Sequence, residues 1–190
     1  MPNSTPSHAA VVIVGGGVAG CSIAYHLVKL GITDVLLLER QQLSSGTTWH
    51  AAGLVGQLRA TQNLTQMAKY STELYAGLEA ATGQATGFKQ NGAISLATTA
   101  GRMEELRRGA SMAKVFGLVV EEIGRDDIRR LYPLISVDDV VGGVYLPKDG
   151  QINPSDLTQA LAKGARAGGA RILENTKVTD ILTDQGRVTG

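Results

Sequence analysis

Three glycines and one acidic residue carry the clearest chemical signal in this sequence. Gly15, Gly17 and Gly20 form the pattern G-x-G-x-x-G, and Glu39 follows near the spacing of about 20 residues typical of dinucleotide-binding proteins. Gly15 permits a tight turn, Gly17 lets a pyrophosphate approach the backbone, and Gly20 lets a helix pack closely on a strand. The helix N-terminus offers free N–H groups to a phosphate, and Glu39 can accept hydrogen bonds from ribose hydroxyls. The pattern predicts a dinucleotide site, with a glycine turn that binds nothing as the alternative.

The segment after Glu39 bears on which dinucleotide is bound. An acidic residue at the ribose position disfavours the 2′-phosphate of NADP. Residues 43–56 are rich in Ser, Thr, Gly and Ala and show neither helical nor strand periodicity, where an NAD-binding domain would normally continue with another helix and strand. FAD is the longer molecule, so a second backbone-rich loop that cradles its ring system suits it. The residues favour FAD and leave NAD open.

The elements that would position these residues form a βαβ unit. Residues 9–14 are a β-branched run, predicted as a fully buried strand, and residues 35–38 are the next apolar run. Between them, residues 18–30 repeat apolar side chains at helical spacing, and Gly31 ends the helix. A unit of this length implies parallel strands joined by a right-handed crossover.

Further helices and strands follow the Ser/Thr/Gly-rich loop. Helices are predicted at 64–78, through 106–113, at 126–132, and from Asn153-Pro154 to Gly168. Strands are predicted at 92–98, 118–121, 140–146, 172–173 and 178–182. Residues 184–187 form a turn signal, and the run after them stops at Gly190. We therefore expect the chain to be a fragment of a longer protein.

Composition excludes several classes of function. Lys and Arg number 18 against 17 Asp and Glu, a net charge of +1, whereas nucleic-acid-binding proteins carry a concentrated basic surplus. The single cysteine, Cys21, has no partner for a disulfide, and no Cys/His cluster has metal-ligand spacing. No apolar run reaches the roughly 18 residues of a membrane span, and residues 1–8 look like neither a signal nor a transit peptide. We expect no nucleic-acid partner, no membrane span, no metal and a cytoplasmic location.

Two segments make the resemblance to a known family specific. V-V-I-V-G-G-G-V-A-G at 11–20 and G-T-T-W-H-A-A-G-L at 46–54 resemble the sarcosine and dimethylglycine dehydrogenases of the D-amino-acid-oxidase-like flavoprotein superfamily. Matches extend over residues 9–182, and Q-L-R at 57–59 with L-Y-P-L at 131–134 lean toward sarcosine dehydrogenase. The resemblance implies an α/β fold, with a Rossmann-like FAD-binding domain of the glutathione-reductase/D-amino-acid-oxidase type and part of an interleaved α+β substrate domain.

The same resemblance implies a domain organisation and a set of cofactor contacts. Residues 1–8 would be a disordered tail, 9–60 the FAD-binding βαβ unit and flavin loop, 61–150 partly substrate domain, and 151–190 a return to the FAD-binding domain. Val18 and Ala19 would offer N–H groups to the pyrophosphate, Glu39 and Arg40 would bracket the adenosine ribose, and Val178 would meet the adenine. The implied cofactor-binding residues are Gly15, Gly17, Val18, Ala19, Gly20, Glu39, Arg40, Gly46, Thr47, Thr48, His50, Ala51, Ala52, Gly53, Leu54 and Val178.

His50 has the most specific role in that set. The resemblance implies that it carries FAD covalently, through a ring nitrogen bonded to the flavin 8α-methyl group. A neutral imidazole is a nucleophile near pH 7, although a histidine in a polar loop is more often a plain hydrogen-bonding residue. Trp49 would pack beside the flavin, while Cys21, His8 and His26 are interpreted as structural. No residue is assigned as catalytic.

The resemblance also implies an activity. An amine dehydrogenase of this kind oxidises the N-methyl group of a secondary or tertiary amino acid such as sarcosine or dimethylglycine, with hydride passing to flavin N5. Electrons would go to an electron-transfer flavoprotein, tetrahydrofolate would bind in a further C-terminal region, and eukaryotic relatives would work in the mitochondrial matrix. The alternatives are an oxygen-using oxidase of the same superfamily and a non-catalytic truncated product.

Overall fold

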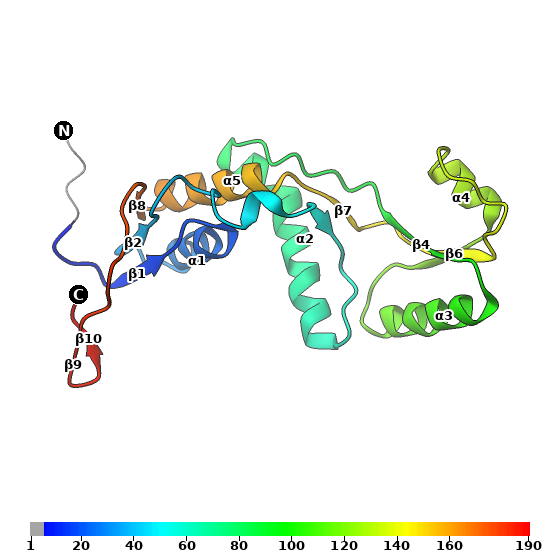
Figure 1. Ribbon diagram of the computed structural model, residues 1–190, viewed down its shortest axis with the longest axis horizontal. Coiled ribbons are helices and arrows are strands. Elements are labelled where there is room, and N and C mark those ends of the chain that lie inside the picture. Colours follow the sequence, from blue (N-terminus) through cyan, green and yellow to red (C-terminus); the bar gives the residue numbers. More distant parts are fainter. Residues whose placement is uncertain (1–5) are drawn as a thin grey trace. The chain divides into compact units, whose positions relative to one another are not determined.

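The computed structural model describes residues 6–190, which form two compact units (Figure 1). Unit 1 comprises the chain up to Gly53, Gly77–Gly87 and Asn153–Gly190, and unit 2 comprises Leu54–Ala76 and Phe88–Ile152. The first five residues of the predicted disordered tail lie outside the described residues. Helix α2, Gln62–Thr82, contributes its first part to unit 2 and its last turns to unit 1.

Unit 1 is built on a parallel sheet with the order β1-β2-β8. Its strands are β1 (Val11–Val14), β2 (Val35–Leu38) and β8 (Arg171–Leu173), and its main helices are α1 (Val18–Lys29) and α5 (Pro154–Ala167). Both crossovers step in the same direction across the sheet, so right-handed connections place both helices on the same face. The two helices pack against each other, which completes the predicted βαβ core.

The ends of the unit 1 helices follow the predicted signals. Asn153 caps α5, because its side-chain oxygen accepts hydrogen bonds from the N–H groups of Ser155 at 3.0 Å and Asp156 at 3.1 Å. Pro154 occupies the first helical position, where no N–H is needed. Gly31 ends α1 with a φ of +87°, a conformation in which a side chain would be strained.

Two expectations for unit 1 are wrong. Strand β1 is not fully buried: Ile13 faces α1, while Val12 and Val14 point to the other face and are 51% and 60% exposed. Residues 178–182 form no strand, because Leu182 pairs with residues 189 and 190 of the terminal hairpin instead of with the sheet. That hairpin, β9 (Thr183–Asp184) and β10 (Arg187–Val188), turns at the predicted place.

Unit 2 contains an antiparallel sheet with the order β4-β6-β5. Its strands are β4 (Ala93–Ala97), β5 (Glu121–Ile123) and β6 (Gly142–Leu146), with the helices α3 (Ala100–Val115) and α4 (Arg125–Leu131). Side chains of β6 alternate between two hydrophobic clusters: Val144 and Leu146 pack on the α3 side, and Tyr145 packs with Ile128 of α4. A separate pair, β3 (Leu54–Val55) and β7 (Gly150–Gln151), is also antiparallel.

Two sequence patterns in unit 2 are shifted or reassigned. The strand expected at 118–121 begins at Glu121, because Leu118 and Val120 belong to the cluster beneath α3 and not to the sheet. In α2 the buried positions include Thr65 and Thr72, while Leu64 and Met67 of the expected apolar stripe are 51% and 66% exposed. Both threonine hydroxyls donate to backbone carbonyl oxygens, so neither loses its hydrogen bonding when it is buried.

Candidate functional site

The glycine turn between β1 and α1 has the geometry of a phosphate-binding turn. Gly15 has a φ of +109°, and its N–H donates to the carbonyl oxygen of Leu38 at 2.9 Å. A Cβ at Gly15 would meet nothing within 4 Å, so the backbone there is open to an approaching group. A Cβ at Gly20 would instead collide with the Gly15 carbonyl oxygen. The turn therefore needs Gly15 for its conformation and Gly20 for its packing.

Gly16, which the motif leaves unspecified, is as constrained as its neighbours. Its N–H donates to Oε2 of Glu39 at 2.6 Å, and its carbonyl oxygen accepts the N–H of Ser44 at 3.0 Å. A Cβ at this position would lie 2.5 Å from Cδ2 of Leu43 and 2.9 Å from Cβ of Glu39. The only signal for this role in the sequence is that Gly16 is the middle one of three consecutive glycines.

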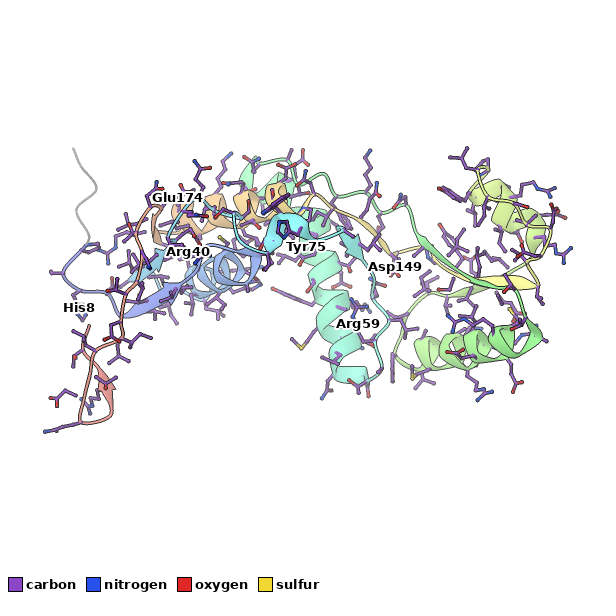
Figure 2. The ribbon with its side chains drawn as sticks, viewed as in Figure 1. His8, Arg40, Arg59, Tyr75, Asp149 and Glu174 are labelled. Carbon is purple, nitrogen blue, oxygen red and sulfur yellow. The ribbon has the colours of Figure 1, made fainter. Side chains whose placement is uncertain are left out.

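Glu39 lies at the end of β2 and is only 9% exposed. Its two carboxylate oxygens accept the N–H groups of Gly16 and, at 2.9 Å, Gln41. Each carboxylate oxygen has two lone pairs, so the group retains capacity to accept further hydrogen bonds from ribose hydroxyls. Arg40 follows directly and is exposed (Figure 2). The backbone of Thr176 bonds to the carbonyl oxygen of Glu39 at 2.8 Å, which brings the segment leading to Val178 beside this position.

Thr48 connects the Ser/Thr/Gly-rich loop to the start of α1. Its hydroxyl oxygen accepts the N–H of Val18 at 3.1 Å and would lie 3.0 Å from a Cβ at Gly17. The Val18 N–H, expected to face a pyrophosphate, thus points to the threonine hydroxyl. That hydroxyl keeps its own hydrogen for donation, so Thr48 places a donor at the positive end of α1.

His50 ends a short 3₁₀ turn, η1 (Thr48–His50), and its side chain is exposed. The ring lies edge-on to the ring of Trp49, with centroids 3.8 Å apart, and Trp49 is 58% exposed. Gly46 has open space around it, and Gly53 adopts a φ of +74°. The rings of Trp49 and His50 are therefore presented to solvent by a turn whose first residue, Thr48, is fixed to α1.

The remaining predicted cofactor residues are less closely grouped. Thr47, Ala51 and Ala52 are exposed loop residues, and Ala19 lies in the first turn of α1. Val178 is partly buried in an irregular segment after β8. Leu54 belongs to β3 in unit 2 and is 81% exposed.

Two residues that the sequence patterns do not identify, Glu174 and Ser155, hold the start of the Ser/Thr/Gly-rich loop by hydrogen bonds from other parts of unit 1. Oε1 of Glu174 accepts the N–H of Leu43 at 2.7 Å, and the hydroxyls of Ser44 and Ser155 lie 3.3 Å apart. More than 100 positions separate the partners in each pair, so no local pattern could reveal them.

Cys21 is completely buried on α1, and burial raises the pKa of its thiol to about 12. The thiol therefore stays protonated near neutral pH, which agrees with a role in the core and not as a nucleophile. His26 contacts the Ser22 carbonyl oxygen within the same helix at 2.7 Å, as expected of a structural histidine.

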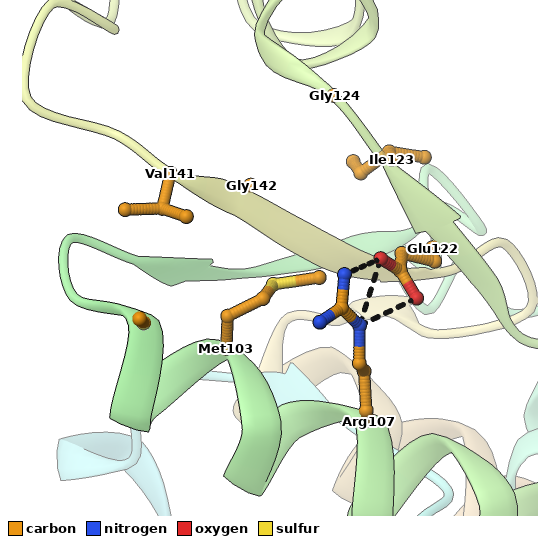
Figure 3. A pocket seen from close by; sticks show the side chains of 8 residues that line it. Met103, Arg107, Glu122, Ile123, Gly124, Val141 and Gly142 are labelled. Atoms are coloured by element: carbon orange, nitrogen blue, oxygen red, sulfur yellow. Dashed lines mark hydrogen bonds and ion pairs between the residues drawn. The ribbon is translucent and has the colours of Figure 1, made fainter.

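Unit 2 contains two open cavities, one bordered by an ion pair and the other mainly apolar. One, of about 450 Å³, lies between α3 and the β5-β6 edge, and the ion pair of Arg107 with Glu122 borders it (Figure 3). The hydrogen bonds of that pair lower the pKa of Glu122 and raise the pKa of Arg107. The second, of about 420 Å³, is lined mainly by apolar residues together with Tyr132 and Tyr145. Within residues 6–190, no three His, Cys, Asp or Glu side chains group as metal ligands would.

A buried carboxylate, Asp149, lies in the same unit as Arg59 (Figure 2). It is 5% exposed, and its Oδ1 accepts the N–H of Gln57 at 2.9 Å. Burial raises the pKa of Asp149, while the hydrogen bond from Gln57 and the charge of Arg59 oppose that shift. The carboxylate joins the ends of β3 and β7, and we assign it a structural role.

Residues 10–190 match the protein family described as DAO, FAD dependent oxidoreductase. The chain is 44% identical over 185 residues to 4-methylaminobutanoate oxidase (formaldehyde-forming) from Paenarthrobacter nicotinovorans, covering 97% of this chain and 22% of that protein. It is 41% identical to mitochondrial sarcosine dehydrogenase from Homo sapiens, covering 93% and 19%. Mitochondrial dimethylglycine dehydrogenase from Rattus norvegicus is 40% identical, covering 98% and 23%. The resemblance inferred from the motifs is confirmed.

The fold is also similar to that of solved structures. The crystal structure of glycine oxidase from Bacillus cereus ATCC 14579 superimposes with a TM-score of 0.82 at 33% identity, covering 96% of this chain and 50% of that one. The chain thus spans about a fifth of the curated relatives' length and half of the glycine oxidase chain. None of the helices in residues 6–190 is both long and apolar enough to cross a membrane.

Proposed function

Because the chain belongs to the DAO family of FAD dependent oxidoreductases, we propose that it holds FAD at the glycine turn of unit 1 and serves in the oxidation of an N-methyl amino acid such as sarcosine or dimethylglycine. The observation that carries the cofactor assignment is the open backbone at Gly15, next to a carboxylate, Glu39, already oriented by the N–H of Gly16. This arrangement fits a pyrophosphate and an adjoining ribose.

Each part of unit 1 then has a task toward the cofactor. The turn, the N–H of Ala19 and the Thr48 hydroxyl, which itself accepts the N–H of Val18, bind the phosphates. Glu39 accepts hydrogen bonds from the ribose, Arg40 covers its outer side, and the segment at Val178 lies along the adenine. The loop from Gly46 to Leu54 lines the flavin. Unit 1 would be the FAD-binding domain, and much of unit 2, within residues 61–150, would belong to a substrate domain.

FAD bound in this way supplies the acceptor for a hydride from the substrate N-methyl carbon. The N-methyl carbon would lose two electrons, and the resulting iminium would be hydrolysed by water or would give its one-carbon unit to tetrahydrofolate, with release of the demethylated amine. An electron-transfer flavoprotein would then receive the two electrons. The names of the dehydrogenase relatives support this substrate class.

His50 would tether the cofactor covalently. Its ring is exposed and is held by a turn anchored at Thr48 to the phosphate end of the site, which supports this role. A bond between the ring nitrogen and the flavin 8α carbon would remove one proton from each partner, and the two electrons set free would need an external oxidant such as oxygen. Denaturing the protein in acid tests the bond: flavin should remain with the wild-type pellet and be released entirely from His50→Ala.

The substrate assignment is tested by adding amines to the flavin-loaded full-length protein without oxygen. Sarcosine or dimethylglycine should bleach the oxidised flavin absorbance, whereas glycine, which has no N-methyl group, should leave it unchanged. Bleaching by glycine alone, or by none of the three, would contradict the proposal. Reoxidation rates with oxygen and with an artificial acceptor then separate a dehydrogenase from an oxidase, the alternative that the 4-methylaminobutanoate oxidase relative favours.

A non-catalytic product is the remaining alternative. Expressing residues 1–190 alone addresses it directly. A soluble protein that binds FAD supports an independent cofactor-binding role, whereas an insoluble or flavin-free protein assigns the function to a longer chain. For the localisation we propose the cytoplasm in a bacterial cell and the mitochondrion in a eukaryotic one, and the name of the human sarcosine dehydrogenase supports the second.

A further inference from the structure

We propose that Glu174 and Ser155 are positioning residues that hold the His50 loop, residues Leu43–Gly53, in the conformation required for cofactor attachment. The inference rests on the proposed function, because the loop is assigned to the flavin. Both residues lie outside every motif that marks the site, and both belong to unit 1 together with the loop. Each makes a hydrogen bond to the beginning of the loop, where the chain leaves β2.

The first contact is made by the Glu174 carboxylate, which directly follows β8 (Figure 2). Its Oε1 accepts the N–H of Leu43 at 2.7 Å, a charge-assisted hydrogen bond of short length. Leu43 is 4% exposed, and its side chain packs where a Cβ on Gly16 would lie. The carboxylate therefore fixes the residue that seats the loop against the phosphate-binding turn.

The second contact involves Ser44, which adopts a φ of +67° although it is not a glycine. A side chain in this left-handed region is strained, and such a conformation persists only where its surroundings impose it. The surroundings here are specific: the Ser44 N–H donates to Gly16, and its hydroxyl lies 3.3 Å from the Ser155 hydroxyl in the first turn of α5. Ser155 is in turn fixed because its N–H is bound by Asn153.

These contacts hold the first residues of the His50 loop. From Ser44 the chain runs through Gly46, which nothing crowds, to Thr48, where the hydroxyl bonds to Val18. The rings of Trp49 and His50 project beyond that point. Two anchors, one at Leu43–Ser44 and one at Thr48, thus define where the histidine ring is presented. Without the Glu174 and Ser155 contacts, the start of the loop would keep only the buried Leu43 side chain and the bond of the Ser44 N–H to Gly16, and His50 would sample a wider volume.

Trp49 provides a readout that requires no cofactor. It is the chain's single tryptophan, it is 58% exposed and it contacts the His50 ring, so its emission and anisotropy report the order of the loop. In Glu174→Ala the loop should be freer, with lower Trp49 anisotropy in the FAD-free protein. FAD affinity should fall on the order of tenfold, the effect of losing one hydrogen bond to a charged group. The fraction of covalently bound flavin should fall as well.

Three further variants distinguish the loss of the Glu174 hydrogen bond to Leu43 from the loss of its charge and from a general loss of stability. Glu174→Gln keeps an oxygen that can accept the Leu43 N–H and should restore wild-type anisotropy, although it loses the ion pair with Arg166 at 3.9 Å. Arg166→Ala removes only that ion pair and should behave like wild type. Glu73→Ala, at an exposed site on α2, is the matched control for deleting a glutamate side chain.

A second set of variants tests the Ser155 contact. Ser155→Ala should loosen the loop, and Ser44→Gly, which relieves the backbone strain but removes the same hydroxyl contact, should loosen it further. If Glu174→Ala fails to fold, the serine variants and Glu174→Gln decide the question. Unchanged Trp49 anisotropy in Glu174→Ala and Ser155→Ala would overturn the inference. Failure of the wild type to bind FAD would instead refute the proposed function and leave the anisotropy result valid.

Discussion

At the scale of single residues, a glycine of the turn and a glycine on an open helix face differ in what they contribute to stability. Gly20 lies against the carbonyl oxygen of Gly15, while Gly109 on α3 has nothing within 4 Å of an added Cβ. Gly20→Ala should therefore destabilise the protein by about 2 kcal/mol or more, as overpacking does. Gly109→Ala should stabilise it by roughly 0.5–1 kcal/mol through helix propensity. Urea unfolding of the two variants measures both effects, and equal effects of the same sign would contradict this packing.

Asp149 gives a prediction about pH. Its folded-state pKa is raised by burial, so it favours folding most below its ordinary pKa, and this contribution is lost as pH rises through the raised value. Asp149→Asn keeps an oxygen for the Gln57 N–H but carries no charge. The stability of the wild type relative to Asp149→Asn should fall from acid toward neutral pH and then level off. The comparison is made by denaturant unfolding over that range, with exposed Asp138→Asn as control; a rise with pH would contradict the assignment.

At the scale of elements, two side-chain-capped helices, one in each unit, offer a matched comparison. Asn153 caps α5 in unit 1, and Thr99 caps α3 in unit 2 by accepting the N–H of Arg102 at 3.2 Å. Replacing either by Ala should destabilise the protein by about 1 kcal/mol. Only Asn153→Ala should also weaken FAD binding, because Asn153 fixes Ser155 at the His50 loop. Titration of both variants with FAD checks this, and equal loss of affinity in both would argue against it.

The elements also show which sequence signals can be trusted. The glycine turn, α1, β2 and the cap of α5 were all predicted, because each depends on local chemistry: backbone freedom, helical periodicity, a strand run and a capping side chain. The strand predictions were wrong where an apolar run packs in a core or in a connecting segment instead of pairing in a sheet. Leu118 and Val120 fill the core beneath α3, and the run from Val178 to Leu182 leads into a hairpin. Periodicity identifies an apolar residue but not its partner.

For the whole molecule, the sequence anticipated the fold class and the family, and the structure added the connections between distant segments. The G-x-G-x-x-G pattern and Glu39 predict a dinucleotide site, but the pattern does not specify Gly16, where the turn, the acidic residue and the His50 loop meet. Glu174 and Ser155 could not be predicted, because their partners lie more than 100 residues away and no motif links them. Such long-range hydrogen bonds become visible only once the chain is folded.

The roles proposed for the residues of unit 1 all require that FAD is the dinucleotide held at the glycine turn. Titrating the cofactor-free protein with FAD, NAD and NADP while following Trp49 fluorescence tests this most directly. FAD should quench the emission in a saturable way, NAD and NADP should not, and Glu39→Gln should weaken FAD binding roughly tenfold because the amide accepts fewer hydrogen bonds than the carboxylate. Tighter binding of NAD than of FAD, or FAD binding that is unaffected by Glu39→Gln, would contradict the assignment of this site.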